Sequence, residues 1–200
     1  HLAFTSTRVM NVCAVAGQTA GTAAGMCAKE KIFPRDISAS PERVETLRQK
    51  LLRDGQIILG AKNNDPLDLA RSAKVSATQS CDGTTPENIL TGQIFDMKGE
   101  YKNRWRAEIK TKPSITLEWD KPVKISEDAI NLATGSRLLT QTVETALMKR
   151  VLQAPQPETL KDFNVKATLA DGTEKELANI RGNHQKRCII KIPEVDAKKL

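Results

Sequence analysis

The stretch GEYKNRWRAE places two aromatic rings among cationic side chains. Tyr101 and Trp105 supply the rings, and Arg104, Lys102 and Arg106 supply hydrogen-bond donors. An exposed ring that stacks on the apolar face of a sugar, beside polar groups that bind its hydroxyls, is one way to hold a carbohydrate on a loop. Tyr101, Trp105 and Arg104 are therefore candidate carbohydrate-binding residues. Trp105 has a second interpretation, as a side chain that fills the core of a β domain.

A second cationic cluster occupies the segment IRGNHQKRC, residues 180–188. It contains four basic or titratable residues: Arg181, His184, Lys186 and Arg187. Such a cluster could bind a phosphate or an acidic sugar, but we favour the interpretation of a solvated hairpin. No catalytic role is assigned to His184, because no carboxylate partner lies near it in the sequence.

Metal-ligand patterns are weak. Asp82 and Gly83 with Glu87 and Asn88 bring oxygen ligands close enough for calcium, but a turn closed by side-chain caps is the simpler interpretation. The four cysteines, Cys13, Cys27, Cys81 and Cys188, form no CxxC pair and predict no zinc site. We expect no metal, and we expect the cysteines to act as small buried hydrophobic residues.

The composition bounds the function classes. With 39% hydrophobic and 28% charged residues, the 200-residue chain can bury a core and is not a disordered chain. The net charge of +7 is spread along the sequence, and aromatic residues make up only 4% of it. Binding of single-stranded nucleic acid needs aromatic rings along a basic groove, so we predict no nucleic-acid partner.

The first part of the chain predicts helices. A helix is expected from about Thr7 to Lys29, with glycines 17, 21 and 25 on one face. Residues 9–28 are uncharged, but they lack Leu, Ile and Phe, so we predict a buried helix rather than a membrane span. The chain turns around Pro34, and a second helix starts at Pro41 with Ser40 as its cap and ends near Asp54. Residues 61–73 read as a linker with a short helical turn.

From Lys74 onward the apolar residues alternate or form short runs, which is typical of β-strands. We expect an antiparallel β sandwich with the clearest hairpin turn at Asp171 and Gly172. The expected strands are 75–77, 115–119, 123–125, 130–132, 163–169, 175–180 and 188–192. Residues 141–160 fit either a helix or a strand with a long loop. The fold class is therefore α+β, with a helical part at residues 1–73 and a β-sandwich domain at residues 74–200.

The segment HLAFTSTRVMNVCAVAGQTAGTAAG, residues 1–25, resembles the C-terminal flavin-contacting segment of a family of bacterial FAD-dependent oxidoreductases. The shared features are the His, the Ser/Thr-Arg-Val-Met turn and the helix of small residues. Residues 51–80 and the later stretches ITLEWDKPVKIS and LKDFNVKATLADGTEKELANIRGNHQKR are similar to the tail of the same family. The resemblance implies a discoidin-like, galactose-binding-like jelly-roll sandwich for that tail.

The resemblance also implies a flavin contact at residues 6–10. The family's pattern places Ser6, Thr7, Arg8, Val9 and Met10 against the flavin. A helix that starts there directs free N–H groups and a partial positive charge outward, which suits the negative charge of a reduced flavin. The alternative is that Ser6 or Thr7 only caps a helix and Arg8 pairs with a surface carboxylate.

The chain lacks a Gly-x-Gly-x-x-Gly turn for the FAD pyrophosphate. With His1 as its first residue, we therefore expect it to be a C-terminal fragment of an oxidoreductase whose N-terminal flavin domain is its partner. It should have no complete active site and should bind no FAD alone. One alternative is a carbohydrate-binding accessory module of a polysaccharide-degrading enzyme similar to xanthan lyases. Another is a purely structural sandwich. An appended sandwich favours a periplasmic or extracellular location.

Overall fold

The computed structural model describes residues 10–96, 100–132 and 159–200. Helices come first: α2 (Met10–Glu30), α3 (Pro34–Ser38) and α4 (Pro41–Arg53). The strands follow: β1 (Lys74–Ala77), β2 (Ile115–Asn131), β3 (Phe163–Leu169), β4 (Glu174–Ile180) and β5 (Arg187–Lys199). The predicted α+β fold class, with a helical segment before an antiparallel β region, is confirmed. The stretch 141–160 falls almost wholly outside the described residues.

The predicted helix boundaries hold where they are described. Ser40 caps α4 by accepting a hydrogen bond from the Arg43 N–H at 3.3 Å, and Pro41 occupies the first turn. The expected turn around Pro34 is a short helix instead, α3, because Asp36 accepts a 2.8 Å hydrogen bond from the Phe33 N–H and so caps it.

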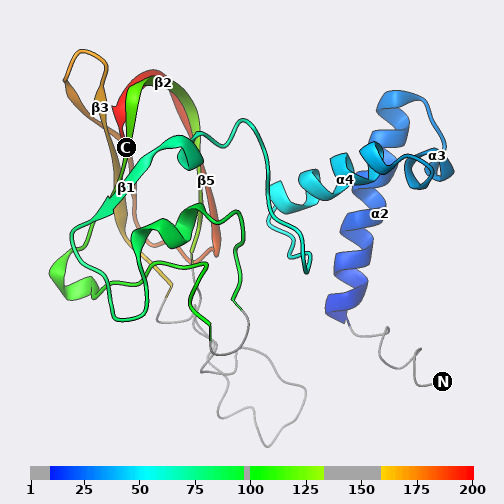
Figure 1. Cartoon of the computed structure of the whole chain (residues 1–200), viewed down its shortest axis with the longest axis horizontal. Coiled ribbons are helices and arrows are strands. Elements are labelled where there is room, and N and C mark those ends of the chain that lie inside the picture. Colours follow the sequence, from blue (N-terminus) through cyan, green and yellow to red (C-terminus); the bar gives the residue numbers. More distant parts are fainter. Residues whose placement is uncertain (1–9, 97–99, 133–158) are drawn as a thin grey trace, which may run out of the picture.

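The helix α2 is much less buried than we expected from its composition. Met26 and Cys27 are buried with Ile37 of α3, but most of α2 is exposed, including Val12 and Val15. The prediction of a buried helix is wrong for the described residues. Among the described residues, α3 and α4 pack against one side of α2 (Figure 1), and Gln56 after α4 donates to the Val15 carbonyl and to the Thr19 hydroxyl at 3.4 Å each. Most of the remaining surface of α2 is exposed.

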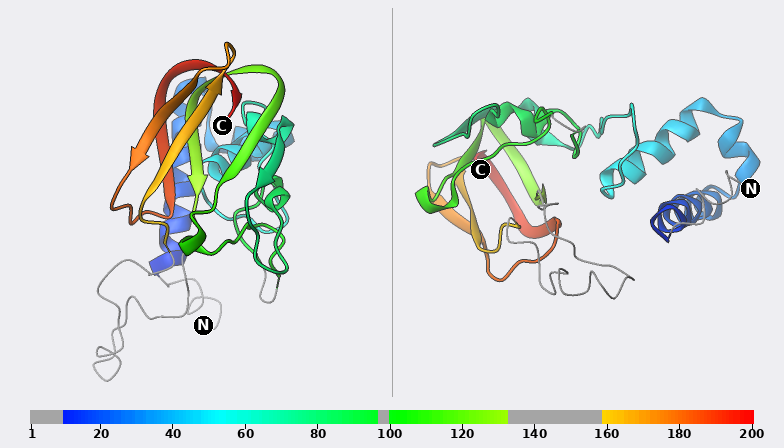
Figure 2. Two further views of the ribbon diagram at one scale, coloured as in Figure 1. Left: turned by 90° about the vertical axis from the view of Figure 1, so that its left-hand side faces the viewer. Right: turned by 90° about the horizontal axis from the view of Figure 1, so that it is seen from below.

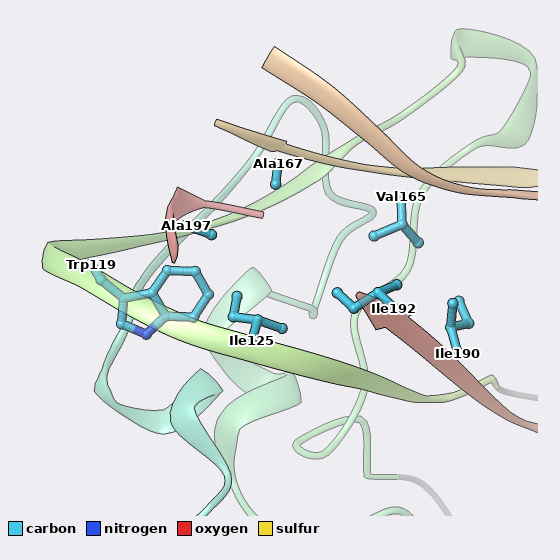
Figure 3. Packing of buried hydrophobic residues seen from close by; sticks show 7 residues of the cluster. All are labelled: Trp119, Ile125, Val165, Ala167, Ile190, Ile192 and Ala197. Carbon is cyan, nitrogen blue, oxygen red and sulfur yellow. The ribbon is translucent and has the colours of Figure 1, made fainter. Parts of the chain in front are cut away.

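One five-stranded sheet forms the β region, in the order β1-β2-β5-β3-β4, and all its pairs are antiparallel. The long strands β2 and β5 bend strongly, as Figure 2 shows. In consequence, side chains of β3 point toward side chains of β2 and β5 across a common core (Figure 3). The buried members of this core are Trp119, Ile125, Val165, Ala167, Ile190, Ile192 and Ala197.

Two strands are longer than their sequence signals. The three runs expected at 115–119, 123–125 and 130–132 are one strand, β2, and β5 continues past Pro193 to Lys199. Proline cannot donate to a strand ladder and is tolerated at bulges. Pro122 lies in the register shift between Glu118 and Val123, and Pro193 lies opposite the shift between Ile125 and Glu127. The prolines therefore bend these strands without ending them.

Candidate functional site

Most of the proposed flavin-contacting residues lie outside the described part of the chain. The residues outside it are Ser6, Thr7, Arg8 and Val9. The fifth, Met10, is the first residue of α2. The expected helix is therefore present directly after them. Among the described residues nothing lies within 4 Å of where a side chain at Gly17, Gly21 or Gly25 would begin. No described residue therefore covers the glycine face of α2.

The carbohydrate candidates lie in the long connection between β1 and β2, residues 78–114. The structure brings Tyr101 and Arg104 together, since the Arg104 guanidinium carbon is 5.7 Å from the centre of the Tyr101 ring. The guanidinium of Arg106 approaches the same ring to 5.2 Å. Tyr101 is 46% exposed, so this cationic and aromatic group lies at the surface.

Trp105 projects away from that group. Its indole N–H donates to the Gln79 carbonyl at 3.1 Å and to the Ser80 hydroxyl at 3.0 Å. Successive side chains of an extended segment point in opposite directions, which explains why the two flanking arginines face Tyr101 and Trp105 does not. Trp105 is half-buried and is not part of the buried β core. Its observed contacts hold the loop onto residues 79–80.

A buried carboxylate, that of Asp96, fixes Arg104. The side chain of Asp96 is only 2% exposed, and it accepts a hydrogen bond from Arg104 Nε and another from the Asn103 N–H at 2.8 Å. The role of Asp96 could not be predicted from the sequence, because Asp96 is eight residues from Arg104 in an irregular segment and no sequence pattern connects the two.

The side-chain amide of Asn88 ties the same loop together. Its Nδ2 donates to the carbonyl oxygens of Tyr101 at 2.9 Å and Arg104 at 3.1 Å. Its carbonyl oxygen lies 3.4 Å from the Thr85 hydroxyl, which donates to it. These contacts of Asn88 fit the predicted turn closed by side-chain caps. No group of three or more metal-ligating side chains gathers within the described ranges.

Arg181, from the second cationic cluster, and the cysteines have mainly structural surroundings. Arg181 Nη1 donates to the carbonyl oxygens of Ile180 at 2.7 Å and Phe163 at 3.2 Å. Its guanidinium therefore binds both strands at the open end of the β3–β4 hairpin. Cys27 and Cys188 are buried as expected, whereas Cys13 is exposed on α2. Burial raises the pKa of the Cys188 thiol, and the nearby Asp128 carboxylate raises it further.

A hollow of about 460 Å³ lies between α4 and residues 64–66. Gln49 crosses it, accepting from the Asn64 N–H at 2.7 Å and donating to the Lys62 carbonyl at 3.0 Å. Its lining mixes carboxylates and cations, and it brings together none of the residues that the sequence singled out.

Comparison with known proteins gives a family match for the first part of the chain. Residues 1–51 match the model of a family described as FAD dependent oxidoreductase, which confirms the resemblance of the first segment. No curated protein matches the chain. In the described part of the chain, no helix has the length and apolarity needed to cross a membrane.

Among the solved structures that this chain resembles are the following two. One is the family 32 carbohydrate-binding module of EndoD from Streptococcus pneumoniae, with 21% identity and a TM-score of 0.42; the match covers 64% of this chain and 77% of that one. The other is CpGH89CBM32-5 from Clostridium perfringens in complex with GalNAc-β-1,3-galactose, with 11% identity and a TM-score of 0.43. The match covers 65% of this chain and 81% of that one.

Proposed function

We propose that this chain carries the flavin-side end of an FAD-dependent oxidoreductase, followed by an accessory β domain. The family match over residues 1–51 is the observation that carries the proposal. The exposed α2 supports it, because a helix of Ala, Val and Gly residues is expected to pack against further protein. The covering partner would be the dinucleotide-binding part of the oxidoreductase.

Within that enzyme, residues 6–10 would contact the flavin. The start of α2 at Met10 supports this role, since a helix N-terminus offers unpaired N–H groups to a negatively charged ring edge. FAD would supply hydride or electron transfer when bound, and this chain would help to orient it. The chain contains no pyrophosphate-binding turn, so no catalytic activity is assigned to it alone.

The test uses the product of the complete reading frame that contains this chain. Arg8→Ala should reduce the FAD retained after purification or lower its reduction potential, measured by visible absorbance and redox titration. The matched control is Arg48→Ala, since the Arg48 side chain is 54% exposed on α4 and lies inside the same family match. The 200-residue chain should purify colourless. Unchanged FAD content and potential in the Arg8 variant, or a yellow 200-residue chain, would contradict the proposal.

A second candidate function, carbohydrate binding, is favoured by the exposed Tyr101 ring next to Arg104. The half-buried Trp105 would support the loop rather than stack on the sugar. An extracytoplasmic location would suit such a partner. A glycan array with the 200-residue chain tests this function, and Tyr101→Ala should weaken any hit. A purely structural β domain would give no hit.

A further inference from the structure

The Tyr101 ring has two guanidinium groups over it, those of Arg104 and Arg106. A guanidinium that lies over an aromatic face keeps its N–H donors at its edge, where they can bind other groups. Tyr101 therefore restrains two arginines without consuming their hydrogen bonds.

The two arginines differ in what they already bind. Arg104 is committed to the buried carboxylate of Asp96. Arg106 is exposed, and its guanidinium has no carboxylate partner among the described residues. In that part of the chain, the Tyr101 ring is the one group with which its side chain makes a polar or ring interaction. Arg106 thus presents the planar fork of donors that recognises a carboxylate in bidentate fashion.

The backbone beneath this group is held in place. The Cys81 N–H donates to the Arg106 carbonyl at 2.8 Å, Trp105 is bonded to Gln79 and Ser80, and Asn88 binds the Tyr101 and Arg104 carbonyls. Little additional ordering is needed when a ligand binds, and the entropic cost of binding is correspondingly smaller.

The two guanidiniums also limit what the Tyr101 ring can do. With their guanidinium carbons 5.7 and 5.2 Å from the ring centre, they compete with a neutral sugar for stacking on the ring, whereas a negatively charged ligand gains from both. The Tyr101 hydroxyl makes no hydrogen bond to the described residues and can both donate to and accept from hydroxyl groups. A ligand that fits both features carries a carboxylate and several hydroxyls on one small ring.

We propose that Arg106 and Tyr101 form a binding site for a carboxylate-bearing sugar, with Arg104 as a fixed cation at its side. The proposal rests on the carbohydrate function above and specifies its ligand class. An acidic peptide shares the carboxylate but lacks the hydroxyls, and it serves as a test of that distinction.

The experiment measures binding to the 200-residue chain by calorimetry. The probes are an oligogalacturonate, its fully carboxyl-reduced neutral counterpart and a glutamate-rich peptide of equal charge. The oligogalacturonate should bind tightest. Arg106→Gln should weaken it by about tenfold or more, and Arg106→Lys should restore only part of the loss, because lysine lacks the planar fork. Tyr101→Leu should weaken it as well.

The matched control is Lys175→Gln, which removes the same charge from the exposed edge strand β4 and should leave affinity within about twofold. Equal melting temperatures will show that the variants are folded. Equal binding of the neutral oligosaccharide, unaffected by Arg106→Gln, would overturn the acidic-sugar site and keep carbohydrate binding. Binding of none of the saccharides would overturn both. Equal binding of the peptide would overturn the sugar assignment, and full affinity of Arg106→Gln would overturn the role of Arg106.

Discussion

The side chain of Arg187, the first residue of β5, donates a hydrogen bond from Nη2 to the carbonyl oxygen of Arg53, the last residue of α4. Its Nη1 donates to Asn131 of β2 at 3.1 Å. The last carbonyls of a helix have no partner within the helix, and a cation there also opposes the negative end of the helix dipole. Arg187 therefore connects the helical segment to the sheet across the linker.

Arg187→Ala should loosen this connection. Loss of a hydrogen bond from a charged donor is expected to cost about 1–3 kcal/mol, and the exposed linker around Leu59 should become several-fold more sensitive to thermolysin. Arg181→Ala is the matched control, since Arg181 donates to carbonyls within the β region only. An unchanged cleavage rate at the linker in the Arg187 variant would show that this contact does not hold the two parts together.

Trp119→Phe should destabilise the β region by about 1–3 kcal/mol. The Trp119 side chain is buried in the core, and its indole N–H donates to the Leu69 carbonyl at 2.9 Å. Phenylalanine keeps the apolar ring but leaves that carbonyl unpaired. Trp105→Phe removes the same type of donor at a half-buried position, where water can bind the freed acceptors. Its free energy of unfolding should therefore fall by less than that of Trp119→Phe. Denaturant unfolding of both variants gives the comparison, and equal losses would contradict it.

Asp128 should make stability depend on pH. Burial raises its pKa from 3.8 to about 6. The folded state therefore holds the proton more tightly than the unfolded chain, and stability should fall as the pH rises from about 4 to above 6. The loss at neutral pH is on the order of 3 kcal/mol at most.

Asp128→Asn should remove most of this pH dependence and raise the free energy of unfolding at pH 7. Glu127→Gln is the control, because the neighbouring side chain is exposed and points to the opposite face of β2. The Cys188 thiol, whose pKa is raised by Asp128, should also become easier to ionise in the Asn variant, which thiol alkylation against pH measures. A pH profile that Asp128→Asn leaves unchanged would contradict the assignment.

Local signals made most of the fold predictable. The cap at Ser40, the strand 163–169 and the turn at Asp171 and Gly172 depend on residues within a few positions of each other, and each is found as expected. The bent strands were not predictable in this way. Proline within an apolar run usually indicates the end of a strand. Pro122 and Pro193 fit within strands here because they lie at bulges, and those bulges depend on pairing with a strand that is distant in sequence.

The candidate site was predictable only in part. The sequence placed Tyr101 beside Arg104, because the residues lie in one short stretch. It did not reveal that Asp96 binds Arg104 or that Asn88 binds the Tyr101 and Arg104 carbonyls, because these contacts depend on the path of an irregular segment. The exposure of α2 was also not predicted. Its small apolar residues indicate a buried helix, but they do not show which other segment would cover it.

The β domain should need residues that precede its first strand. The change from helical to β patterning suggested a boundary at residue 74, where β1 begins. However, Leu69 and Ala73 pack against the core, and the Leu69 carbonyl accepts the Trp119 hydrogen bond. The Asn63 N–H also donates to the Gly92 carbonyl at 2.9 Å, so part of the linker is bound to the β1–β2 connection.

We therefore expect a chain of residues 61–200 to fold on its own, with a β-type circular dichroism spectrum and a cooperative thermal transition. A chain of residues 74–200 should have the same type of spectrum but unfold at a lower temperature, because it loses the Leu69 contacts and leaves the Trp119 indole N–H without its acceptor. Introducing Trp119→Phe into both chains tests this explanation. Because the substitution removes the indole donor, it should reduce the difference in melting temperature between residues 61–200 and residues 74–200. Equal melting temperatures would place the boundary at residue 74, and a helical or non-cooperative spectrum from residues 61–200 would mean that the β region depends on the helical segment to fold.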